Sequence, residues 1–369
     1  MSQRPEKTDE SPPPAPHAPG SNSDPGGTGN DIGTGSPADA PGGWWIMAVA
    51  GGVLSGFAFT SLVRPSVVAL LFSYAAPLPL FMVGMAFGWP AAMLAAASAF
   101  LYVLWMLGLK AAVFHLVSIA VAPIVLTWLA RQWRPAAGGT EGEAADAEGR
   151  EWYPEGRLLL WTAFLAGGLM SILLLLLGPD AEGVRRSLGE LADAVLKVTG
   201  LANDLPRDQL QQVRTYIISA TPPMTTAMWM FVTLANFWAA ARLVAAFGYP
   251  VRPWAPFWKL TFHPRAMAAL AVASFATLLP GIFGLIGEVF ATALLIAFFI
   301  LGLAVIHALT LGNPWRPVLL AVLYFGLLFI NWLLALPLVI LGLADLAFGL
   351  RQDYARPPRG PDRHGGSRT

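Results

Sequence analysis

Residues 67–87 read VVALLFSYAAPLPLFMVGMAF, an apolar run long enough to cross a membrane as one helix. Pro77 and Pro79 interrupt this run. Because proline has no amide hydrogen, they leave the carbonyls of Ser73 and Ala75 without their helical donors. Such a break is tolerated in hydrocarbon where neighbouring helices, side chains or water bond the freed groups. The stretch therefore predicts a broken membrane helix, which is either a packing kink or part of a site.

The composition of the whole chain indicates an integral membrane protein. Of its 369 residues, 56% are hydrophobic and only 12% are charged, whereas soluble domains carry roughly one quarter charged residues. Mean hydropathy is +0.58. The net charge of +1 gives no basic field for nucleic acid, and the absence of cysteine excludes thiol chemistry. We therefore expect the lipid bilayer, and no nucleic acid, as a partner.

The apolar segments predict an all-α fold, a polytopic transmembrane helical bundle of eight to ten spans. Six spans are expected at Trp44 to Leu62, Val67 to Phe87, Pro90 to Leu109, Ala111 to Ala130, Leu158 to Leu177 and Thr215 to Val244. Met267 to Leu311 is too long for one helix and predicts two spans joined by an outer turn around Gly281 to Gly287. Pro317 to Leu350 predicts two short spans, or a kinked hairpin, turning near Asn331 to Pro337.

Basic residues in the loops predict the orientation of the bundle. Positive charge gathers in three regions: Arg131, Arg134, Arg150 and Arg157; Arg242, Arg252, Lys259 and Arg265; and Arg351, Arg356, Arg359 and Arg363. The positive-inside rule places these regions in the cytoplasm. Both termini are then inside, the number of crossings is even, and we expect a multi-pass protein of the bacterial inner (plasma) membrane.

Composition also predicts the domain organisation. Residues 1–43 and 352–369 are expected to be disordered cytoplasmic tails around a transmembrane domain at 44–351. Within that domain, residues 136–151 (AAGGTEGEAADAEGRE) predict a flexible cytoplasmic loop, and residues 179–213 an external amphipathic insert. Steps of four and three place one apolar stripe on a helix of this insert, at Val184, Leu188, Leu191, Val195 and Val198. The helix either packs on the bundle or acts as a lipid-sensing or partner-binding element.

The sixth span carries the most regular polar pattern in the chain. Positions that follow one another by threes and fours are Ser219, Pro222, Thr226, Trp229, Thr233 and Asn236. They share one helix face if the helix continues through Pro222 and Pro223, and a polar face in a membrane helix faces inward. We expect the freed carbonyls of Ser73 and Ala75 to face the interior and meet this polar face. This face either holds neighbouring helices together by hydrogen bonds or forms the wall of a polar pocket. In the second case the expected substrate-binding residues are Ser73, Tyr74, Pro77, Pro79, Thr226, Trp229, Thr233 and Asn236.

Few other residues could carry chemistry. Glu288, in GLIGEVFATALL, is expected near the external interface, where it is either solvated or a proton or ligand site. His115 and His307 lie near opposite faces of the predicted bundle and have no second ligand three or four residues away, so no metal site is expected. The chain has no GxxxxGK[ST], HExxH or GxSxG motif. We therefore expect no enzyme, no cofactor and no metal.

Small residues recur at four-residue spacing in two spans. One face contains Ala48, Gly52 and Gly56, and the other contains Ala91, Ala95 and Ala99. Such faces let helix backbones approach closely. They indicate helix packing within the chain or, alternatively, docking of a partner subunit.

Several of these segments occur together in a known order. They are APLPLFMVG at Ala76 to Gly84 with Gly88-Trp89, NFWAAARLV at Asn236 to Val244 followed by Arg252-Pro253, GLAVIH at Gly302 to His307, and LGLAD with LR between Leu341 and Arg351. In these segments and their order the chain resembles the YybS-like proteins, a predicted bacterial inner-membrane family classed as a domain of unknown function. That family is distantly similar to the S subunits of energy-coupling-factor transporters. The resemblance implies a bundle that binds a small vitamin-like or metal solute and is powered by a separate ATPase, for which the Ala91, Ala95 and Ala99 face would suit docking.

Two functions follow from these patterns. The first is transport-related binding of a small solute, because interrupted helices around a cavity are how transporters hold solutes. The second is a non-catalytic membrane scaffold or envelope-assembly factor that works through its external helix and its tail. An intramembrane enzyme using Glu288 or His307 is a third alternative.

Overall fold

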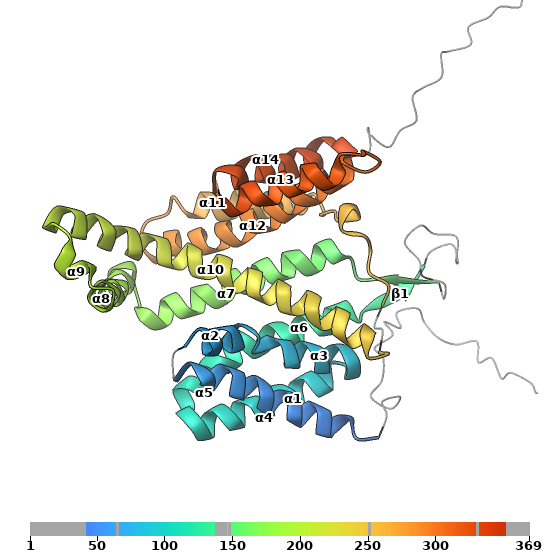
Figure 1. The fold of residues 1–369 in the computed structure, drawn as a ribbon, viewed down its shortest axis with the longest axis horizontal. Coiled ribbons are helices and arrows are strands. Elements are labelled where there is room, and N and C mark those ends of the chain that lie inside the picture. The colour runs from blue at the N-terminus through green and yellow to red at the C-terminus, as the bar shows by residue number, and fades with distance from the viewer. Residues whose placement is uncertain are drawn as a thin grey trace, which may run out of the picture. The chain divides into compact units, whose positions relative to one another are not determined.

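The computed structural model describes residues 42–63, 66–136, 146, 149–249, 252–329 and 332–351. Nearly all of them lie in helices (Figure 1), as the predicted all-α bundle requires. The predicted tails at 1–43 and 352–369 fall outside the described residues, apart from residues 42 and 43. Most of the predicted loop at 136–151 and Asn331 of the predicted hairpin turn are outside them as well.

Two joints between the N-terminal helices are sharp turns at single glycines. The N-terminal elements are α1 (Trp44–Thr60), a 3-10 turn (Ser61–Val63), α2 (Val67–Tyr74), α3 (Pro77–Phe87), α4 (Trp89–Leu107), α5 (Leu109–His115), a π-helical segment (Leu116–Ala120) and α6 (Val121–Ala130). Gly88 and Gly108 join α3 to α4 and α4 to α5 at φ 88° and 84°, a region that residues with a Cβ rarely adopt. These single-residue joints return the chain on itself, so that α4 packs against both α3 and α5.

The two small-residue faces meet each other between α1 and α4. A Cβ built on Gly52 would lie 2.0 Å from the Ala95 carbonyl oxygen, and one on Gly56 would lie 3.3 Å from the Ala99 carbonyl oxygen. Only glycine therefore permits this approach at position 52. Ala91, Ala95 and Ala99 are fully buried. The alanine face is covered by α1 and is not exposed for a second subunit.

The C-terminal helices include one of 40 residues. They are α7 (Glu155–Leu177), α8 (Ala181–Val198), α9 (Leu201–Asp204), α10 (Arg207–Ala246), a 3-10 turn (Phe257–Lys259), α11 (Arg265–Ala276), α12 (Ile282–Leu309), α13 (Arg316–Phe329) and α14 (Trp332–Phe348). α10 continues through Pro222 and Pro223, as the predicted polar face requires. It contacts α3 of the N-terminal helices as well as α7, α8 and α12 (Figure 1).

The number of long spans is smaller than the sequence predicts. Among the described residues, seven helices are long and apolar enough to cross a membrane, counting α2 with α3 and α5 with α6. Three more apolar helices are shorter: α11, α13 and α14. With 12 residues, α11 is about 18 Å long, against a hydrocarbon core of about 30 Å.

The turn before α12 also differs from its prediction. It lies at residues 277–281, whereas the sequence indicates Gly281 to Gly287. Gly287 lies inside α12, where a Cβ would be 2.5 Å from the backbone of Ala276. The glycine is therefore used for close packing of α12 on α11 rather than for a turn. The orientation of the bundle in the membrane stays a prediction.

A short antiparallel hairpin frames the predicted loop at 136–151. Strand β1 (Trp133–Pro135) pairs with β2 (Arg150–Trp152), with Trp133 opposite Trp152. The side chain of Arg134 makes two bonds to Glu151, at 2.8 and 2.9 Å. The acidic, aperiodic composition of this insert gave no signal for strands, and residues at its end are in fact paired.

Candidate functional site

The polar face of α10 divides into a buried part and an exposed end. Pro222, Thr226, Thr233 and Asn236 are buried, whereas Ser219 is exposed. The Thr226 hydroxyl donates to the Pro222 carbonyl of its own helix at 2.8 Å. The face therefore points inward over most of its length, as predicted, and opens towards the N-terminal end of α10.

The break between α2 and α3 presents one backbone carbonyl to this face. Asn236 Nδ2 donates to the Tyr74 carbonyl oxygen at 2.8 Å. The prediction named the Ser73 and Ala75 carbonyls instead, and for these two it is wrong. Their oxygens accept the amides of Ala76 and Leu78, at 3.2 and 3.0 Å. Because Leu78 bonds to Ala75, the carbonyl left for α10 is that of Tyr74.

A second irregular segment offers a carbonyl in the same way. Trp229 Nε1 donates to the Ser118 carbonyl oxygen at 2.6 Å, and Ser118 lies in the π-helical segment before α6. Pro123 follows that segment and supplies no amide hydrogen to the preceding turn. Single π-helical turns of this kind occur mostly as bulges inside α-helices. Trp229 and Asn236 are seven residues apart on α10, so both donors share one face.

These contacts give the predicted substrate-binding residues a role in packing. Trp229 and Asn236 hold backbone carbonyls of other helices, Thr226 bonds within α10, and Pro77 and Thr233 are buried. Pro79 faces a different neighbour, since a Cβ on Gly51 of α1 would lie 3.5 Å from its carbonyl oxygen. Tyr74 and Ser73 lie at the end of α2. That these residues bind a substrate remains a prediction.

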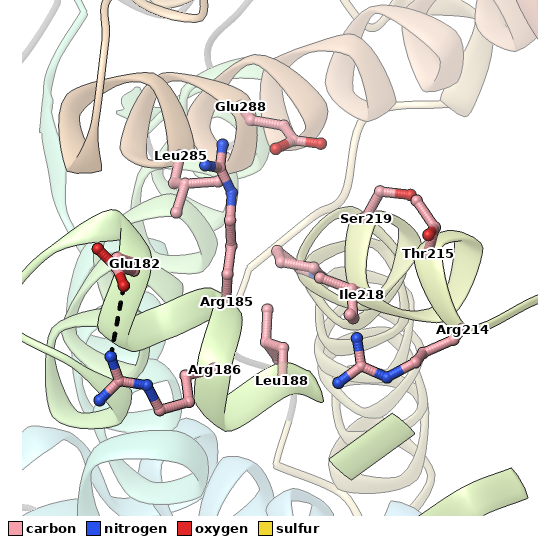
Figure 2. A pocket seen from close by; sticks show the side chains of 11 residues that line it. Glu182, Arg185, Arg186, Leu188, Arg214, Thr215, Ile218, Ser219, Leu285 and Glu288 are labelled. Carbon is pink, nitrogen blue, oxygen red and sulfur yellow. Dashed lines mark hydrogen bonds and ion pairs between the residues drawn. The ribbon is translucent and has the colours of Figure 1, made fainter. Parts of the chain in front are cut away.

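A cavity of about 570 Å³ opens beside the exposed end of the α10 face. We call it the vestibule. It is lined by Glu182, Arg185, Arg186, Leu188, Arg214, Thr215, Ile218, Ser219, Pro222, Leu285 and Glu288, from α8, α10 and α12 (Figure 2). Its floor is apolar and its charged groups come from three elements, which is the usual composition of a small-molecule site.

Two of the vestibule arginines already have carboxylate partners. Arg214 of α10 binds Asp193 of α8 at 2.7 and 3.2 Å, and the hydrogen bond from Arg214 holds the pKa of Asp193 below its usual value of 3.8. Gly189 makes this contact possible, since a Cβ there would lie 2.6 Å from Arg214 Nη2. Arg186 and Glu182 form an exposed pair at 3.5 Å. The Arg214–Asp193 pair ties α10 to α8, whereas the Arg186–Glu182 pair lies within α8.

Arg185 and Glu288 both line the vestibule (Figure 2). Arg185 extends from α8 and Glu288 from α12. Within the part of the chain that the structure describes, neither side chain has a hydrogen bond or an ion pair. Glu288 was predicted as either a solvated or a ligand-binding carboxylate, and the structure places it at the cavity. The sequence did not single out Arg185.

The apolar stripe predicted on the external helix is half right. Val184 and Leu188 are fully buried and pack against Met170, Leu174 and Val289. Leu191, Val195 and Val198 are exposed, at 47%, 39% and 87%, and the inward face continues instead through Ala192 and Leu196. The helix therefore packs on the bundle and lines the vestibule, and part of its apolar surface is exposed.

The two histidines expected at opposite faces are engaged in separate contacts. His115 Nε2 lies 3.2 Å from the Ser55 hydroxyl, and His307 Nε2 lies 2.8 Å from the Tyr324 hydroxyl. No group of three or more potential metal ligands occurs among the residues that the structure describes.

At the opposite end of α7 from the vestibule, the buried Arg252 contacts the segment before α7 and the segment before α11. Arg252 donates to the Tyr153 carbonyl at 2.6 Å and to Glu155. Its guanidinium lies 4.6 Å from the ring centroid of Trp254 and 5.8 Å from that of Trp152. Burial lowers the pKa of Arg252, and the attraction of Glu155 opposes that shift. This cluster fixes the strand pair and the segment before α11 to the start of α7.

A family model described as "Predicted membrane protein (DUF2232)" matches residues 157–346. No curated protein and no solved structure matches the chain. The matched region runs from the start of α7 into α14, and it contains the vestibule and the polar face of α10. The carbonyls of Tyr74 and Ser118, which this face binds, lie before it.

Proposed function

The chain belongs to the DUF2232 family of predicted membrane proteins, and from that premise we propose that it binds a small solute in the vestibule. It does so in the bacterial inner membrane, in the manner of a transporter S subunit whose energy comes from a separate ATPase. In this proposal the chain carries out no chemical reaction. The polar residues of the broken second span and of α10 then serve the solute site indirectly, by holding α10 in place.

The observation that supports this proposal most strongly is the pair Arg185 and Glu288. Two opposite charges face one cavity of about 570 Å³ without an ion pair between them among the described residues. Arg185 is exposed and Glu288 is half-buried, and a partly buried carboxylate without a bonded partner is costly. A polar solute that bonds to both would satisfy them.

The position of α10 supports a transport role. Its N-terminal half lines the vestibule through Arg214, Ser219 and Pro222, and its C-terminal half bonds to the helix break at Tyr74. Solutes in transporters are commonly held beside interrupted helices, whose ends can move against the rest of the bundle. One helix thus connects the cavity to the irregular segments of the N-terminal helices.

The test is to recover the solute from the purified full-length protein. The protein is denatured, and the released small molecules are identified by mass spectrometry. We expect a species in stoichiometric amount from wild type that falls at least tenfold in Arg185→Gln and in Glu288→Gln. Lys197→Gln changes an exposed charge on the same helix α8, outside the vestibule, and should retain the species. Equal recovery of the species from all variants would contradict the proposal. So would the absence of any bound species from wild type, when no solute is lost during purification.

The exposed stripe at Leu191, Val195 and Val198 favours the second candidate, a membrane scaffold. Three large apolar side chains on a surface helix are typical of a contact with a partner or with lipid. Replacing all three with serine should then abolish capture of partner proteins in crosslinking experiments while solute recovery is unchanged. Loss of solute recovery with intact crosslinking would rule the scaffold out.

A further inference from the structure

A second cavity of about 550 Å³ lies at the opposite end of α7 from the vestibule. We call it the α7 groove. It is lined by Tyr153, Arg157, Leu160, Trp161, Phe164 and Phe290. The positions 157, 160, 161 and 164 share one face of α7, and about 10 Å of helix separates the first from the last. The groove therefore runs from a cationic mouth to an aromatic end.

Aromatic side chains fix the shape of the groove. Trp161 Nε1 donates to the Tyr153 hydroxyl at 3.0 Å, which holds both rings at the mouth. At the other end Phe290 of α12 packs on Gly167, where a Cβ would lie 2.4 Å from its ring, and it contacts the ring of Phe164. Tryptophan and tyrosine are the residues enriched at the level of lipid headgroups. We therefore expect the mouth of the groove to lie at headgroup depth and its aromatic end deeper in the bilayer.

The charge at the mouth is available to a ligand. Glu151 binds Arg134 and Glu155 binds Arg252, so each of these carboxylates already has an arginine bonded to it. The hydrogen bond from Arg134 lowers the pKa of Glu151, and the charge of Arg157 adds to that shift. Arg157 is exposed and stacks over the Tyr153 ring, with its guanidinium carbon 5.9 Å from the ring centroid. Among the described residues Arg157 has no ion pair. Arg157 is thus a cation at the mouth of an apolar groove with no carboxylate bonded to it among the described residues.

We propose that the α7 groove binds one anionic phospholipid. The phosphate accepts hydrogen bonds from Arg157, and an acyl chain lies along Leu160, Phe164 and Phe290. An arginine at the membrane surface attracts anionic headgroups, and the groove supplies the apolar contact that a free phosphate cannot use. The site is separate from the vestibule and does not depend on solute binding.

The test measures lipid binding to the full-length protein in non-ionic detergent by native mass spectrometry. The probes are phosphatidylglycerol, phosphatidylcholine and inorganic phosphate. We expect wild type to retain phosphatidylglycerol in preference to phosphatidylcholine, and Arg157→Gln to weaken phosphatidylglycerol binding about fivefold, the effect of one basic residue near an anionic surface. Inorganic phosphate in millimolar excess should not displace the lipid.

The matched control is Arg242→Gln. Arg242 also stacks on an aromatic ring, that of Trp238 at 5.8 Å, but it lines neither cavity described above. This variant should bind phosphatidylglycerol as wild type does, and Arg157→Lys should keep most of the affinity because it keeps the charge. Equal weakening by Arg242→Gln, no effect of Arg157→Gln, or displacement by inorganic phosphate would overturn the proposal.

Discussion

The side-chain amide of Asn236 donates to the backbone carbonyl of Tyr74 at 2.8 Å, across 162 residues of chain. Tyr74 is the last residue of α2, and the proline pair that begins α3 follows it. An unpaired carbonyl in hydrocarbon is costly, and an asparagine on a membrane helix also needs a partner. Each group satisfies the other, so that a broken helix and a polar helix stabilise one another.

Both donors of α10 are expected to contribute to stability independently. Trp229→Phe removes the indole N–H but keeps an aromatic ring, and Asn236→Leu removes the amide. Each should lower the free energy of unfolding by about 0.6–2 kcal/mol. Since about 10 Å of helix separates them, the double variant should show the sum within about 0.5 kcal/mol.

Reversible unfolding in mixed micelles measures these differences. Phe231→Leu, at an exposed position of the same helix, serves as the control and should leave stability unchanged. A double variant that costs no more than either single change would show that the two contacts are one cooperative unit, contrary to this expectation.

Two glycines in helices should respond oppositely to alanine. At Gly52 a Cβ would lie 2.0 Å from the Ala95 carbonyl oxygen, whereas at Gly168 nothing lies within 4 Å of it. Gly52→Ala should force α1 from α4 and destabilise by about 1–3 kcal/mol. Gly168→Ala should be neutral or stabilise by up to about 1 kcal/mol, because alanine favours the helix. Thermal unfolding in detergent compares the two, and similar losses at both sites would argue against the α1 and α4 contact.

Lysine should not replace the buried arginine at position 252. Its ammonium cannot bond to the Tyr153 carbonyl and to Glu155 while also stacking between Trp152 and Trp254, as the guanidinium does. We expect Arg252→Lys to lower stability by about 1–3 kcal/mol in thermal unfolding. The same exchange at the exposed Arg242 should have no measurable effect. If Arg252→Lys unfolds at the same temperature as wild type, the cluster does not depend on the planar guanidinium.

The orientation can be tested directly because the chain has no cysteine. Glu190→Cys places a single thiol on α8, and Arg242→Cys places one near the end of α10, both at exposed positions. The positive-inside rule puts the first outside and the second in the cytoplasm. A membrane-impermeant maleimide should label Glu190→Cys in intact cells and Arg242→Cys only after the membrane is opened. The reverse labelling pattern would show that the bundle has the opposite orientation in the membrane.

The sequence predicts where the helices are irregular better than it predicts what those irregularities bind. Pro77 and Pro79 indicate the break, since a missing amide hydrogen is a local property. Which carbonyl remains free depends on which carbonyls the neighbouring amides bond to. The sequence therefore named Tyr74 as a candidate binding residue but could not identify its carbonyl as the free one. The π-helical segment at Ser118 had no recognised signal, although Pro123 marks the turn that follows it.

The vestibule could not be predicted from the sequence, for a different reason. Arg185, Arg214 and Glu288 come from three helices, and periodicity describes one helix at a time. The apolar stripe of α8 was correct at Val184 and Leu188 but followed the exposed face from Leu191 onward, because steps of three and four can be continued in more than one way. Contacts between elements decide both features.

The account rests most heavily on the claim that the break at Pro77 and Pro79 exposes the Tyr74 carbonyl to Asn236. The most direct test measures the cost of Asn236→Leu in wild type and in a variant with alanine at 77 and 79, using reversible unfolding. Alanine restores the amide hydrogens, so Leu78 can bond to Tyr74 in a continuous helix. We predict a cost of about 0.6–2 kcal/mol in wild type and none, or a gain, in the straightened variant. An equal cost in both backgrounds would contradict the account.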